Sequence, residues 1–303
     1  MSDILATHIT HRVTAGAEPA ARPVVMILPA HEEEATVPDV VRRAPAFLLG
    51  HRVEIVVVDG GSTDRTGESA AAAGATVHSL GHNRGLGAAV REGLAWAVER
   101  GAAATAFLDA DGEYAPEELA ALVAPILEGR ADYVVGSRFA GLPRAMRPQR
   151  WLGNRALTLA MKLLVRRWGV RGLTDGQSGY RALSPGAAAD AEILHDFNYA
   201  QVLTLDLIAK GFRYAEVPVS YRFRQHGRSF VRLGPYLRRV VPAVWRQLRS
   251  APSATAAPEA PARTAPLPPR PIARALRLAE PRSACPGHEP ASRHRVAVGS
   301  GPR

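Results

Sequence analysis

A short acidic segment, Asp109-Ala110-Asp111-Gly112-Glu113, directly follows an apolar run at residues 105–108. If that run is a strand and continues, the side chains of Asp109 and Asp111 point the same way, because alternate residues share one face of a strand. Two carboxylates in that geometry suit Mg²⁺ or Mn²⁺ bridging a diphosphate. An Asp-x-Asp pair in a loop is more often a turn or a helix cap, but its position after a buried strand favours a metal site here.

Two further polar segments follow apolar runs. In Asp59-Gly60-Gly61-Ser62-Thr63-Asp64, the glycines allow close backbone approach, and a carboxylate can accept a hydrogen bond from a ribose hydroxyl or a base N–H. A tight turn capped by Asp64 explains the same residues, and both interpretations can hold together. The segment Asn83-Arg84-Gly85-Leu86-Gly87 has only part of the spacing of a dinucleotide fingerprint, so it is weak evidence for a dehydrogenase.

The elements that must position these segments are visible in the hydrophobic pattern. Short apolar runs lie at 24–28, 53–58, 77–80, 105–108 and 133–135, and helical patterns alternate with them. Helices are expected to open at Thr36, Asp64, Gly87 and Pro116. This alternation predicts an α/β fold with a mainly parallel central sheet and helices on both faces. In such sheets ligands bind beyond the carboxyl ends of the strands, where the three polar segments lie.

Two basic amphipathic helices are predicted in the second half of the chain, at 151–168 and 235–249. In the C-terminal one, apolar residues follow the i, i+3, i+4, i+7 rule, while Arg239, Arg246 and Arg249 fall on the other side. Packing onto the core explains such a stripe. Basic residues opposite Trp and Leu are also typical of an interfacial membrane helix, so the two interpretations stay open.

The net charge of +10 is distributed unevenly along the chain. Residues 1–137 contain ten Arg and nineteen Asp or Glu, residues 138–181 contain ten Lys or Arg and one acid, and residues 213–249 contain nine Arg and one acid. In a functional interpretation, the acidic residues lie beside a metal and the basic residues lie beside a phosphate or an anionic surface. In the alternative interpretation, the basic residues only form a solvated surface in an Arg-rich chain.

Several features of the 303-residue chain bound its class and location. No apolar run approaches the roughly 18 residues needed to span a bilayer. Residues 1–22 lack the features of a secretory signal, so we expect a cytoplasmic protein. The only cysteine, Cys285, fits that compartment and excludes an internal disulfide or a cysteine-based metal cluster. Residues 250–303 are rich in Pro, Ala and Arg without periodicity, which predicts a disordered tail.

Taken together, these segments resemble glycosyltransferase family 2, whose fold is called GT-A, over roughly residues 23–249. Residues 29–33, Pro-Ala-His-Glu-Glu, resemble the family's Pro-x-Tyr-Asn-Glu opening, and residues 59–64 its Asp-Asp-Gly-Ser-x-Asp turn. Residues 83–87 resemble its Asn-x-Gly-x-Gly loop, and the Asp109/Asp111 pair matches its metal motif. The resemblance implies a flexible extension at 1–22, a nucleotide-sugar-binding half at 23–137 and an acceptor half at 138–249.

The resemblance also implies roles for the residues of the donor half. The expected nucleotide-sugar-binding residues are Pro29, Glu33, Asp59, Asn83 and Asp109. The expected metal ligands are Asp109, Asp111 and, where relatives often have Gln, Glu113. His31, Glu32 and Gly60 stand where the family has Tyr, Asn and Asp. These departures leave the choice between a UDP-sugar and a GDP-sugar open.

Three segments of the acceptor half, at 136–139, 175–181 and 216–229, resemble the polyprenyl-phosphate branch, the dolichol-phosphate mannose synthase group. The residues that this resemblance assigns to the acceptor phosphate are Arg138, Ser178, Arg181, Arg224 and Ser229. Arginine suits phosphate because its planar fork donates paired, charge-assisted hydrogen bonds. For any one of these arginines alone, a surface ion pair is the simpler explanation.

The expected reaction is an inverting, in-line displacement at the anomeric carbon by an acceptor phosphate oxygen. The expected catalytic residues are Asp109, Asp111, Asp175 and Arg181. A phosphate nucleophile is ionised at neutral pH and demands no strong base. If the acceptor is instead a hydroxyl, Asp175 is the candidate base; with a phosphate acceptor, Asp175 is expected to position Arg181 or the sugar.

The expected partners are a nucleotide diphosphate sugar, a polyprenyl phosphate and an anionic membrane surface, with the enzyme peripheral on the inner face of the cell membrane. A separate membrane-protein partner is left open. One alternative is a soluble family 2 enzyme that glycosylates a small-molecule or glycan hydroxyl. Another is a catalytically inactive protein that binds nucleotide or anionic polymer. No nucleic-acid-binding signature is present, so no nucleic-acid partner is expected.

Overall fold

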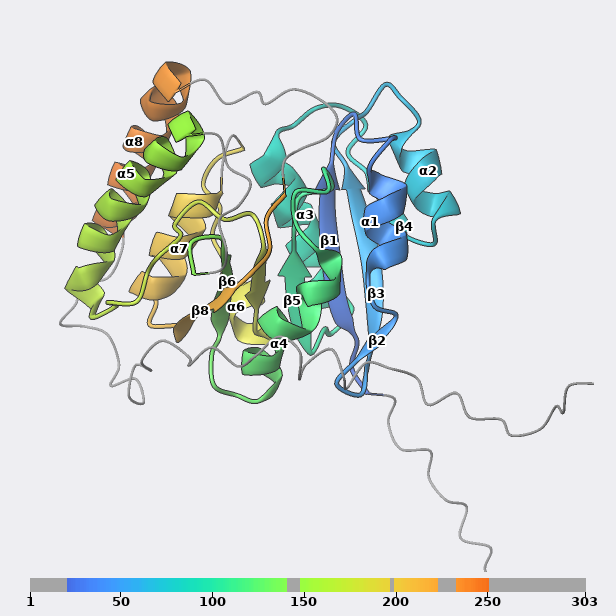
Figure 1. Cartoon of the computed structure of the whole chain (residues 1–303), viewed down its shortest axis with the longest axis horizontal. Helices are drawn as coiled ribbons and strands as arrows, with labels where there is room; N and C mark the ends of the chain where they lie inside the picture. Colours follow the sequence, from blue (N-terminus) through green and yellow to red (C-terminus); the bar gives the residue numbers. More distant parts are fainter. Residues whose placement is uncertain (1–20, 141–147, 197–198, 223–232, 251–303) are drawn as a thin grey trace, which may run out of the picture.

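The computed structural model describes residues 21–140, 148–196, 199–222 and 233–250 (Figure 1). Its centre is one sheet with the strand order β2-β3-β1-β5-β7-β6-β8, and β4 pairs with β3 beside this path. The strands are β1 (Val24–Ala30), β2 (Phe47–Leu48), β3 (His51–Asp59), β4 (Thr76–Ser79), β5 (Ala104–Phe107), β6 (Tyr133–Ser137), β7 (Arg181–Leu183) and β8 (Tyr214–Pro218). The sheet is mainly parallel, as predicted; β7 runs antiparallel to β5 and β6, and β2 antiparallel to β3.

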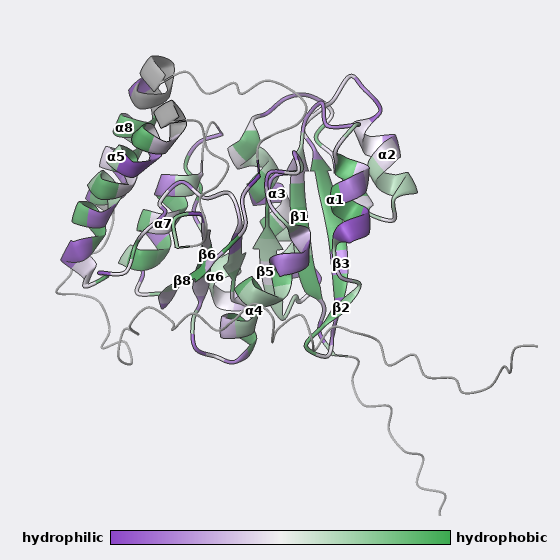
Figure 2. Cartoon of the chain, viewed as in Figure 1, coloured by the Kyte–Doolittle hydropathy of each residue, from purple (hydrophilic) through white to green (hydrophobic). Residues whose placement is uncertain are grey.

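Helices cover both faces of this sheet. They are α1 (Val37–Arg43), α2 (Thr66–Ala72), α3 (Leu86–Glu99), α4 (Leu119–Leu127), α5 (Pro148–Val165), α6 (Pro185–Asp190), α7 (Ala200–Ala209) and α8 (Leu233–Ser250), with short 3₁₀ turns at Pro116–Glu118 and Arg166–Trp168. In β1, Met26 faces a core shared with α1 and α4, whereas Ile27 faces a core shared with α3, α6 and α7. The buried strands therefore carry apolar residues on both sides, and Figure 2 shows them as a largely hydrophobic centre.

A third, smaller apolar cluster joins α5, α7 and α8. Met161 and Val165 of α5 are buried against Leu205 of α7, and Val244 and Leu248 of α8 pack against the same cluster. Figure 1 shows α5 and α8 side by side at the margin of the molecule. None of the helices in the described part of the chain is long and apolar enough to cross a bilayer.

The two predicted amphipathic helices are present, but their apolar residues do not all face the core. On α8, Val240 and Ala243 are buried, while Val241 and Trp245 are exposed. The stripe predicted on this helix is thus split between the protein interior and solvent. The predicted N-terminal extension and C-terminal tail lie outside the described residues, apart from residues 21, 22 and 250.

Candidate active site

The polar segments singled out in the sequence meet at one edge of the sheet. Strands β1, β3 and β5 are parallel, so residues 30, 59 and 108 leave the sheet on the same side. Strand β7 runs the other way and begins at Arg181, which pairs with Phe107 of β5 and Val135 of β6. Its reversed direction brings the preceding segment, 175–180, to that same edge.

The donor-side loops bind each other through side chains. Asp59 accepts hydrogen bonds on Oδ1 from the backbone N–H (3.0 Å) and the hydroxyl (2.6 Å) of Ser62. Glu32 has a left-handed backbone, φ 58°, and its Oε1 accepts from the N–H of Thr63 at 2.7 Å. The structure therefore brings segments 29–33 and 59–64 together. Of the predicted nucleoside-binding residues, Pro29, Glu33 and Asp59 are all buried here.

His31 occupies the end of β1 beside Gly60, where a Cβ added to Gly60 would lie 3.5 Å from Cβ of His31. Its Nδ1 atom is buried and has no hydrogen-bond partner among the described residues. Burying a ring nitrogen without a partner is unfavourable, so this position suits a ligand that supplies one.

The predicted carboxylate pair lies in a turn. Strand β5 ends at Phe107, so the condition under which Asp109 and Asp111 would share one face of a strand is not met. Gly112 has a left-handed φ of 74°, which closes the turn, and Oδ1 of Asp111 accepts from the N–H of Glu113 at 3.0 Å. Asp109 lies against Gly179: a Cβ there would come 2.5 Å from Oδ2 of Asp109. The geometry of the turn, rather than the alternation of a strand, therefore determines where the carboxylates of Asp109 and Asp111 lie.

These carboxylates fit a divalent cation of the kind that also binds substrate phosphates. Among the residues that the structure describes, no three His, Cys, Asp or Glu side chains form a metal cage. Mg²⁺ ordinarily takes one or two protein carboxylates and completes its shell with water and phosphate oxygens. Asp109 and Asp111 satisfy that requirement. Oε2 of Glu113 accepts a hydrogen bond from the hydroxyl of Tyr221 at 2.6 Å, and its role as a third ligand stays a prediction.

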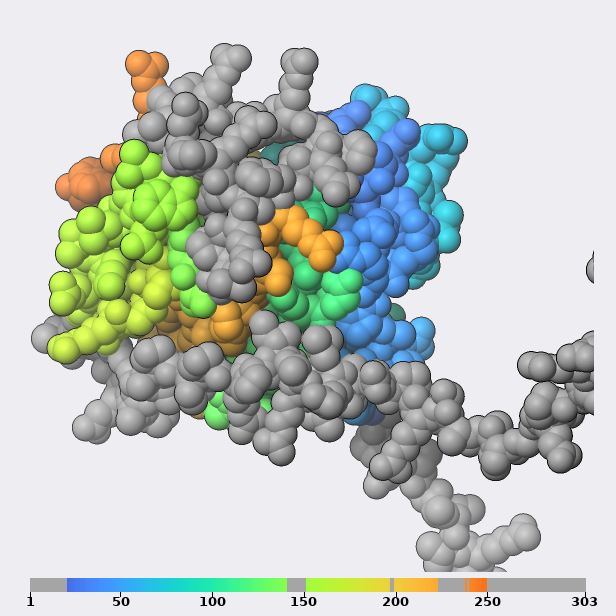
Figure 3. All heavy atoms as spheres, viewed as in Figure 1, coloured from blue at the N-terminus to red at the C-terminus, as the bar shows by residue number. Residues whose placement is uncertain are grey.

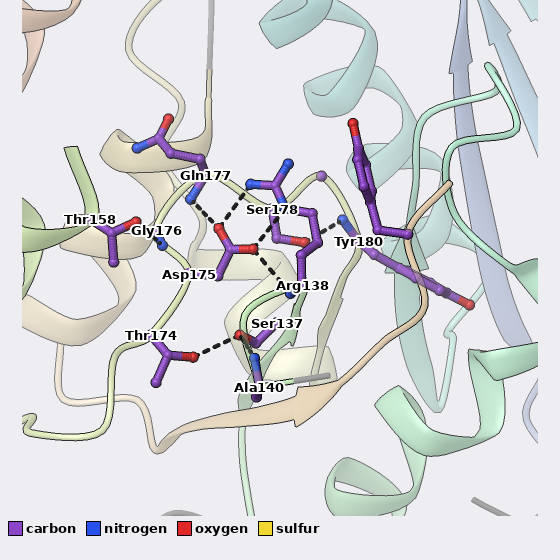
Figure 4. Close-up of polar contacts among 12 residues, drawn as sticks. Ser137, Arg138, Ala140, Thr158, Thr174, Asp175, Gly176, Gln177, Ser178 and Tyr180 are labelled. Carbon is purple, nitrogen blue, oxygen red and sulfur yellow. Dashed lines mark hydrogen bonds and ion pairs between the residues drawn. The ribbon is translucent and has the colours of Figure 1, made fainter. Parts of the chain in front are cut away.

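A buried ion pair stands on the acceptor side of this edge (Figure 4). Arg138 donates to Asp175 through Nε (2.7 Å) and Nη2 (2.9 Å), and its backbone N–H donates to the same carboxylate at 3.1 Å. The two side chains are only 3% and 0% exposed. Burial opposes the charge of Arg138, but Tyr114 and Asp175 outweigh it and raise the pKa of Arg138. Asp175 therefore holds Arg138, a pairing that was not predicted, and the expectation that Asp175 positions Arg181 or the sugar stays a prediction.

Glu216 of β8 fixes the backbone beside this ion pair, a role that the sequence did not indicate. It accepts hydrogen bonds on Oε1 from the N–H groups of Thr174 (2.8 Å) and Asp175 (3.2 Å), and burial raises its pKa. Thr158 of α5 accepts from the N–H of Gly176 at 3.2 Å. The loop that carries Asp175 is thus anchored to the sheet and to α5.

Arg181 lies entirely inside the protein. Its Nε donates to the carbonyl of Ser178 at 2.8 Å, and Nη1 donates to the carbonyl of Ala200 (2.8 Å), to the hydroxyl of Thr204 (3.0 Å) and to that of Tyr133. Only Nη2 has no hydrogen-bond partner among the described residues. Arg181 braces the turn before β7, and its predicted contact with the acceptor phosphate stays a prediction.

Two buried tyrosines complete the turn, and neither was predicted. The hydroxyl of Tyr114 accepts from the N–H of Gly179 at 2.8 Å and lies 3.3 Å from the hydroxyl of Ser178. Burial raises the pKa of Tyr114 to about 12, which keeps its hydroxyl protonated. Tyr199 donates to the carbonyl of Gly179 at 3.3 Å. Because aromatic residues ordinarily indicate core, the sequence carried no signal for this role.

Three more of the predicted residues remain to be placed. Arg224 and Ser229 lie outside the described residues. Asn83 accepts on Oδ1 from the N–H of Gly85 at 2.9 Å and lines a separate pocket, so its place at the donor stays a prediction.

The chain is similar in sequence to known proteins. A model of the family described as glycosyl transferase family 2 matches residues 25–182. Polyprenol monophosphomannose synthase from Mycolicibacterium smegmatis is 33% identical over 237 residues, which cover 71% of this chain and 84% of that protein. UDP-N-acetylglucosamine–dolichyl-phosphate N-acetylglucosaminyltransferase from Methanococcus voltae is 32% identical and covers 68% of this chain and 88% of that protein.

A solved structure shows the same fold. Glucosyl-3-phosphoglycerate synthase from Mycobacterium tuberculosis, in complex with Mn²⁺, UDP and glucosyl-3-phosphoglycerate, matches with a TM-score of 0.62 at 25% identity, over 76% of this chain and 81% of that one. The family match spans more than half of the chain, and the relatives agree with it. The chain therefore belongs to glycosyltransferase family 2: it is a glycosyltransferase with the GT-A fold, similar to the polyprenyl-phosphate branch of that family.

Proposed function

We propose that this glycosyltransferase moves a hexose from a nucleotide diphosphate sugar, of the GDP-mannose or UDP-glucose type, to a polyprenyl phosphate at the membrane surface. The observation that carries the proposal is the buried pair of Arg138 and Asp175 at the same sheet edge as the Asp109 turn. Asp175 holds Nε and Nη2 of this guanidinium, so in the proposal an anionic acceptor meets its Nη1 group. Both oxygens of Asp175 accept from Arg138, so Asp175 is poorly placed to deprotonate a hydroxyl.

In this proposal, separate groups of residues bind the nucleoside and the metal ion. Pro29, Glu33 and Asp59 form the nucleoside end of the site, with the unpartnered ring nitrogen of His31 beside them. When bound at Asp109 and Asp111, Mg²⁺ or Mn²⁺ would neutralise charge on the departing nucleoside diphosphate. Mn²⁺ and UDP occupy the structure of glucosyl-3-phosphoglycerate synthase, which supports this assignment.

The transfer exchanges one bond for another. An oxygen of the acceptor phosphate forms a bond to the anomeric carbon as the bond from that carbon to the nucleoside diphosphate breaks, and the configuration inverts. The nucleophile is already ionised at neutral pH, so no protein group has to remove a proton. Arg138 holds the acceptor anion in line with the donor, and positioning supplies much of the rate.

Helix α5 supports a lipid acceptor. Its residues Trp151, Leu152, Leu159 and Leu163 are 42–66% exposed. Figure 3 shows α5 on the outer surface of the molecule. A groove of about 390 Å³ joins this helix to the loop before Asp175, and it is lined by Leu152, Arg155, Ala156, Thr158, Leu159, Lys162, Leu173 and Thr174. Apolar side chains with interspersed cations suit a prenyl chain and an interfacial position.

The proposed location follows from the same surface. Basic residues of α5 and α8 border the exposed apolar ones, and the cytoplasmic leaflet carries the negative charge that attracts such surfaces. We place the enzyme in the cytoplasm, peripheral on the inner face of the cell membrane.

One alternative has an observation in its favour. The matching structure of glucosyl-3-phosphoglycerate synthase contains a glucosylated phosphoglycerate, a small molecule rather than a lipid. On this alternative, Arg138 binds the phosphate of a small acceptor whose hydroxyl is glycosylated, and α5 merely packs on α7.

Acceptor choice separates the two. Labelled UDP- and GDP-sugars are offered with Mn²⁺ or Mg²⁺ and one of three acceptors: a short polyprenyl phosphate, the unphosphorylated polyprenol of the same length, or 3-phosphoglycerate. Label extractable into the organic phase with the polyprenyl phosphate alone is the expected result. Transfer to 3-phosphoglycerate without transfer to lipid would contradict the proposal and support a small-molecule acceptor.

A further inference from the structure

A second pocket, of about 600 Å³, lies between the start of α3 and helix α8. It is lined by Asn83, Arg84, Gly85, His195, Asp196, Arg238, Pro242, Ala243 and Arg246. None of the residues of the site described above lines it except Asn83, whose donor role is only predicted. The proposed transfer therefore leaves this pocket without a role.

Positive charge dominates the lining. Arg84 comes from the loop before α3, while Arg238 and Arg246 stand two turns apart on α8, and all three are exposed to solvent. The single acid of the lining, Asp196, forms an ion pair with Arg91, and Arg84 forms one with Glu92 outside the lining at 3.2 Å. Arginines from two elements thus converge on one cavity, which concentrates positive potential there.

Two backbone segments, 85–87 and 195–196, lie in close contact beside the pocket. The N–H of Gly87 donates to the carbonyl of Asp196 at 2.8 Å, and a Cβ on Gly87 would come 2.2 Å from the carbonyl oxygen of His195. A Cβ on Gly85 would come 2.5 Å from the carbonyl oxygen of Asp196. These glycines set the 195–196 segment over the start of α3. The carbonyl of Asp196 thus covers the start of α3, and the positive charge of the lining comes from the arginines.

We infer that this pocket binds a phosphate group at a site separate from the Asp109 turn and the Arg138 ion pair. The guanidinium groups of Arg84, Arg238 and Arg246 carry the donors that phosphate oxygens require. Two sources share this chemistry: the headgroup of an anionic lipid and a free phosphate. The exposed Val241 and Trp245, on the neighbouring face of α8, lie beside the pocket's arginines in the same helix.

His195 gives a local signal for occupancy. Its pKa is lowered by burial and by the positive charge of Arg246. An anion in the pocket offsets that charge, so the pKa of His195 should rise when phosphate binds. The ring signals of His195 are assigned in NMR spectra by comparison with His195→Gln, and inorganic phosphate is titrated into the full chain without donor or divalent cation.

A matched pair of double variants tests the assignment. Arg238→Gln/Arg246→Gln removes two charges from the pocket, and the control Arg42→Gln/Arg52→Gln removes two exposed charges from α1 and β3. We expect saturable shifts of the His195 signals in the native chain and in the control variant. In the pocket variant the apparent affinity for phosphate should fall about tenfold or more. Shifts that are not saturable, or that are equal in the two variants, would overturn the proposal.

Vesicles distinguish the two sources of phosphate. The same variants are sedimented with vesicles of phosphatidylcholine alone and of phosphatidylcholine with phosphatidylglycerol. If the pocket takes a headgroup, the pocket variant should lose more binding to phosphatidylglycerol vesicles than the control variant does. If it takes a free phosphate, the two variants should bind these vesicles equally while the titration still separates them.

Discussion

Gly179 determines where the carboxylate of Asp109 can lie. The missing side chain leaves room for Oδ2 of Asp109, which a Cβ would approach to 2.5 Å. The N–H of Gly179 donates to Tyr114, and its carbonyl accepts from Tyr199. These two hydrogen bonds resist any movement of the turn away from Asp109. Two buried tyrosines therefore affect the proposed metal site through one glycine.

Gly179→Ala should displace Asp109 and lower turnover. A misplacement of about 1 Å at a reacting centre can cost about a hundredfold in rate. The control is Gly186→Ala in α6, where the new Cβ meets only Phe212 at an ordinary 3.8 Å. Turnover and the metal concentration for half-maximal activity are measured for both; equal activity of the two variants would contradict the role of Gly179.

Asp111→Ala should abolish turnover and leave the fold intact. The substitution removes a proposed metal ligand together with the hydrogen bond from the N–H of Glu113, which is worth about 1 kcal/mol. Asp111→Asn keeps an acceptor for that hydrogen bond but removes the charge, so it should melt like the native chain and still be inactive. Metal-independent activity in either variant would refute the metal role of Asp111.

Arg138 and Asp175 can be tested as a pair. Asp175→Ala leaves the buried guanidinium unpaired, which should cost about 3–5 kcal/mol in the free energy of unfolding. The double variant Arg138→Met/Asp175→Leu removes both charges and should recover much of that stability without recovering activity. Denaturant unfolding and the transfer assay are run on the two variants. An active double variant would show that Arg138 has no part in holding the acceptor.

Individual residues of the donor site could be predicted, but their partners could not. The motifs at 59–64 and 109–113 were recognisable because turn residues and carboxylates follow apolar runs. The partner of Asp175 lies 37 positions away and depends on the direction of β7, which no local pattern reveals. Likewise, the bracing role of Arg181 follows from its burial, and burial of an arginine is not expected from sequence.

At the scale of elements, the first half of the chain was predictable and the second half much less so. Strands β1, β3, β4, β5 and β6 lie within two residues of the predicted apolar runs. Strand β7 has only three residues and begins with a buried Arg, and β8 includes Glu216, so neither has the composition of a central strand. Periodicity found α8 but could not show that α7 covers only part of its apolar stripe.

Helix α5 carries the prediction that belongs to this scale. Leu159→Ser/Leu163→Ser replaces two leucines that are each 58% exposed. Burying a leucine contributes roughly 1.5–3 kcal/mol, so vesicle affinity should fall about tenfold or more. Folding stability should change little, because neither side chain packs in the core.

The control for α5 is Val98→Ser, an exposed apolar residue of α3 that is 43% exposed. Sedimentation with phosphatidylglycerol-containing vesicles compares the two, at low and at high salt. Because exposed charges are screened by salt, binding should weaken as ionic strength rises. Equal vesicle binding by the two variants would show that α5 does not contact the membrane and only packs against the protein.

The whole molecule joins an acidic half to a basic half along one edge of a sheet. In the proposed function, the half with the carboxylates would bind a cation and a diphosphate, and the half with the arginines would bind a second anion. The reversal of β7 brings the two together, since it carries residues 175–180 back to the carboxyl ends of the parallel strands. A mainly parallel sheet with one reversed strand is thus the framework on which both substrates can meet.

The most direct test of the proposed transfer is mass spectrometry of the lipid extracted after incubation with UDP- and GDP-sugars, a short polyprenyl phosphate and Mn²⁺ or Mg²⁺. The account predicts a product heavier than the acceptor by one hexose, with equimolar release of the nucleoside diphosphate and none formed after chelation of the metal. Metal-dependent consumption of the donor with the polyprenyl phosphate left unmodified would contradict it.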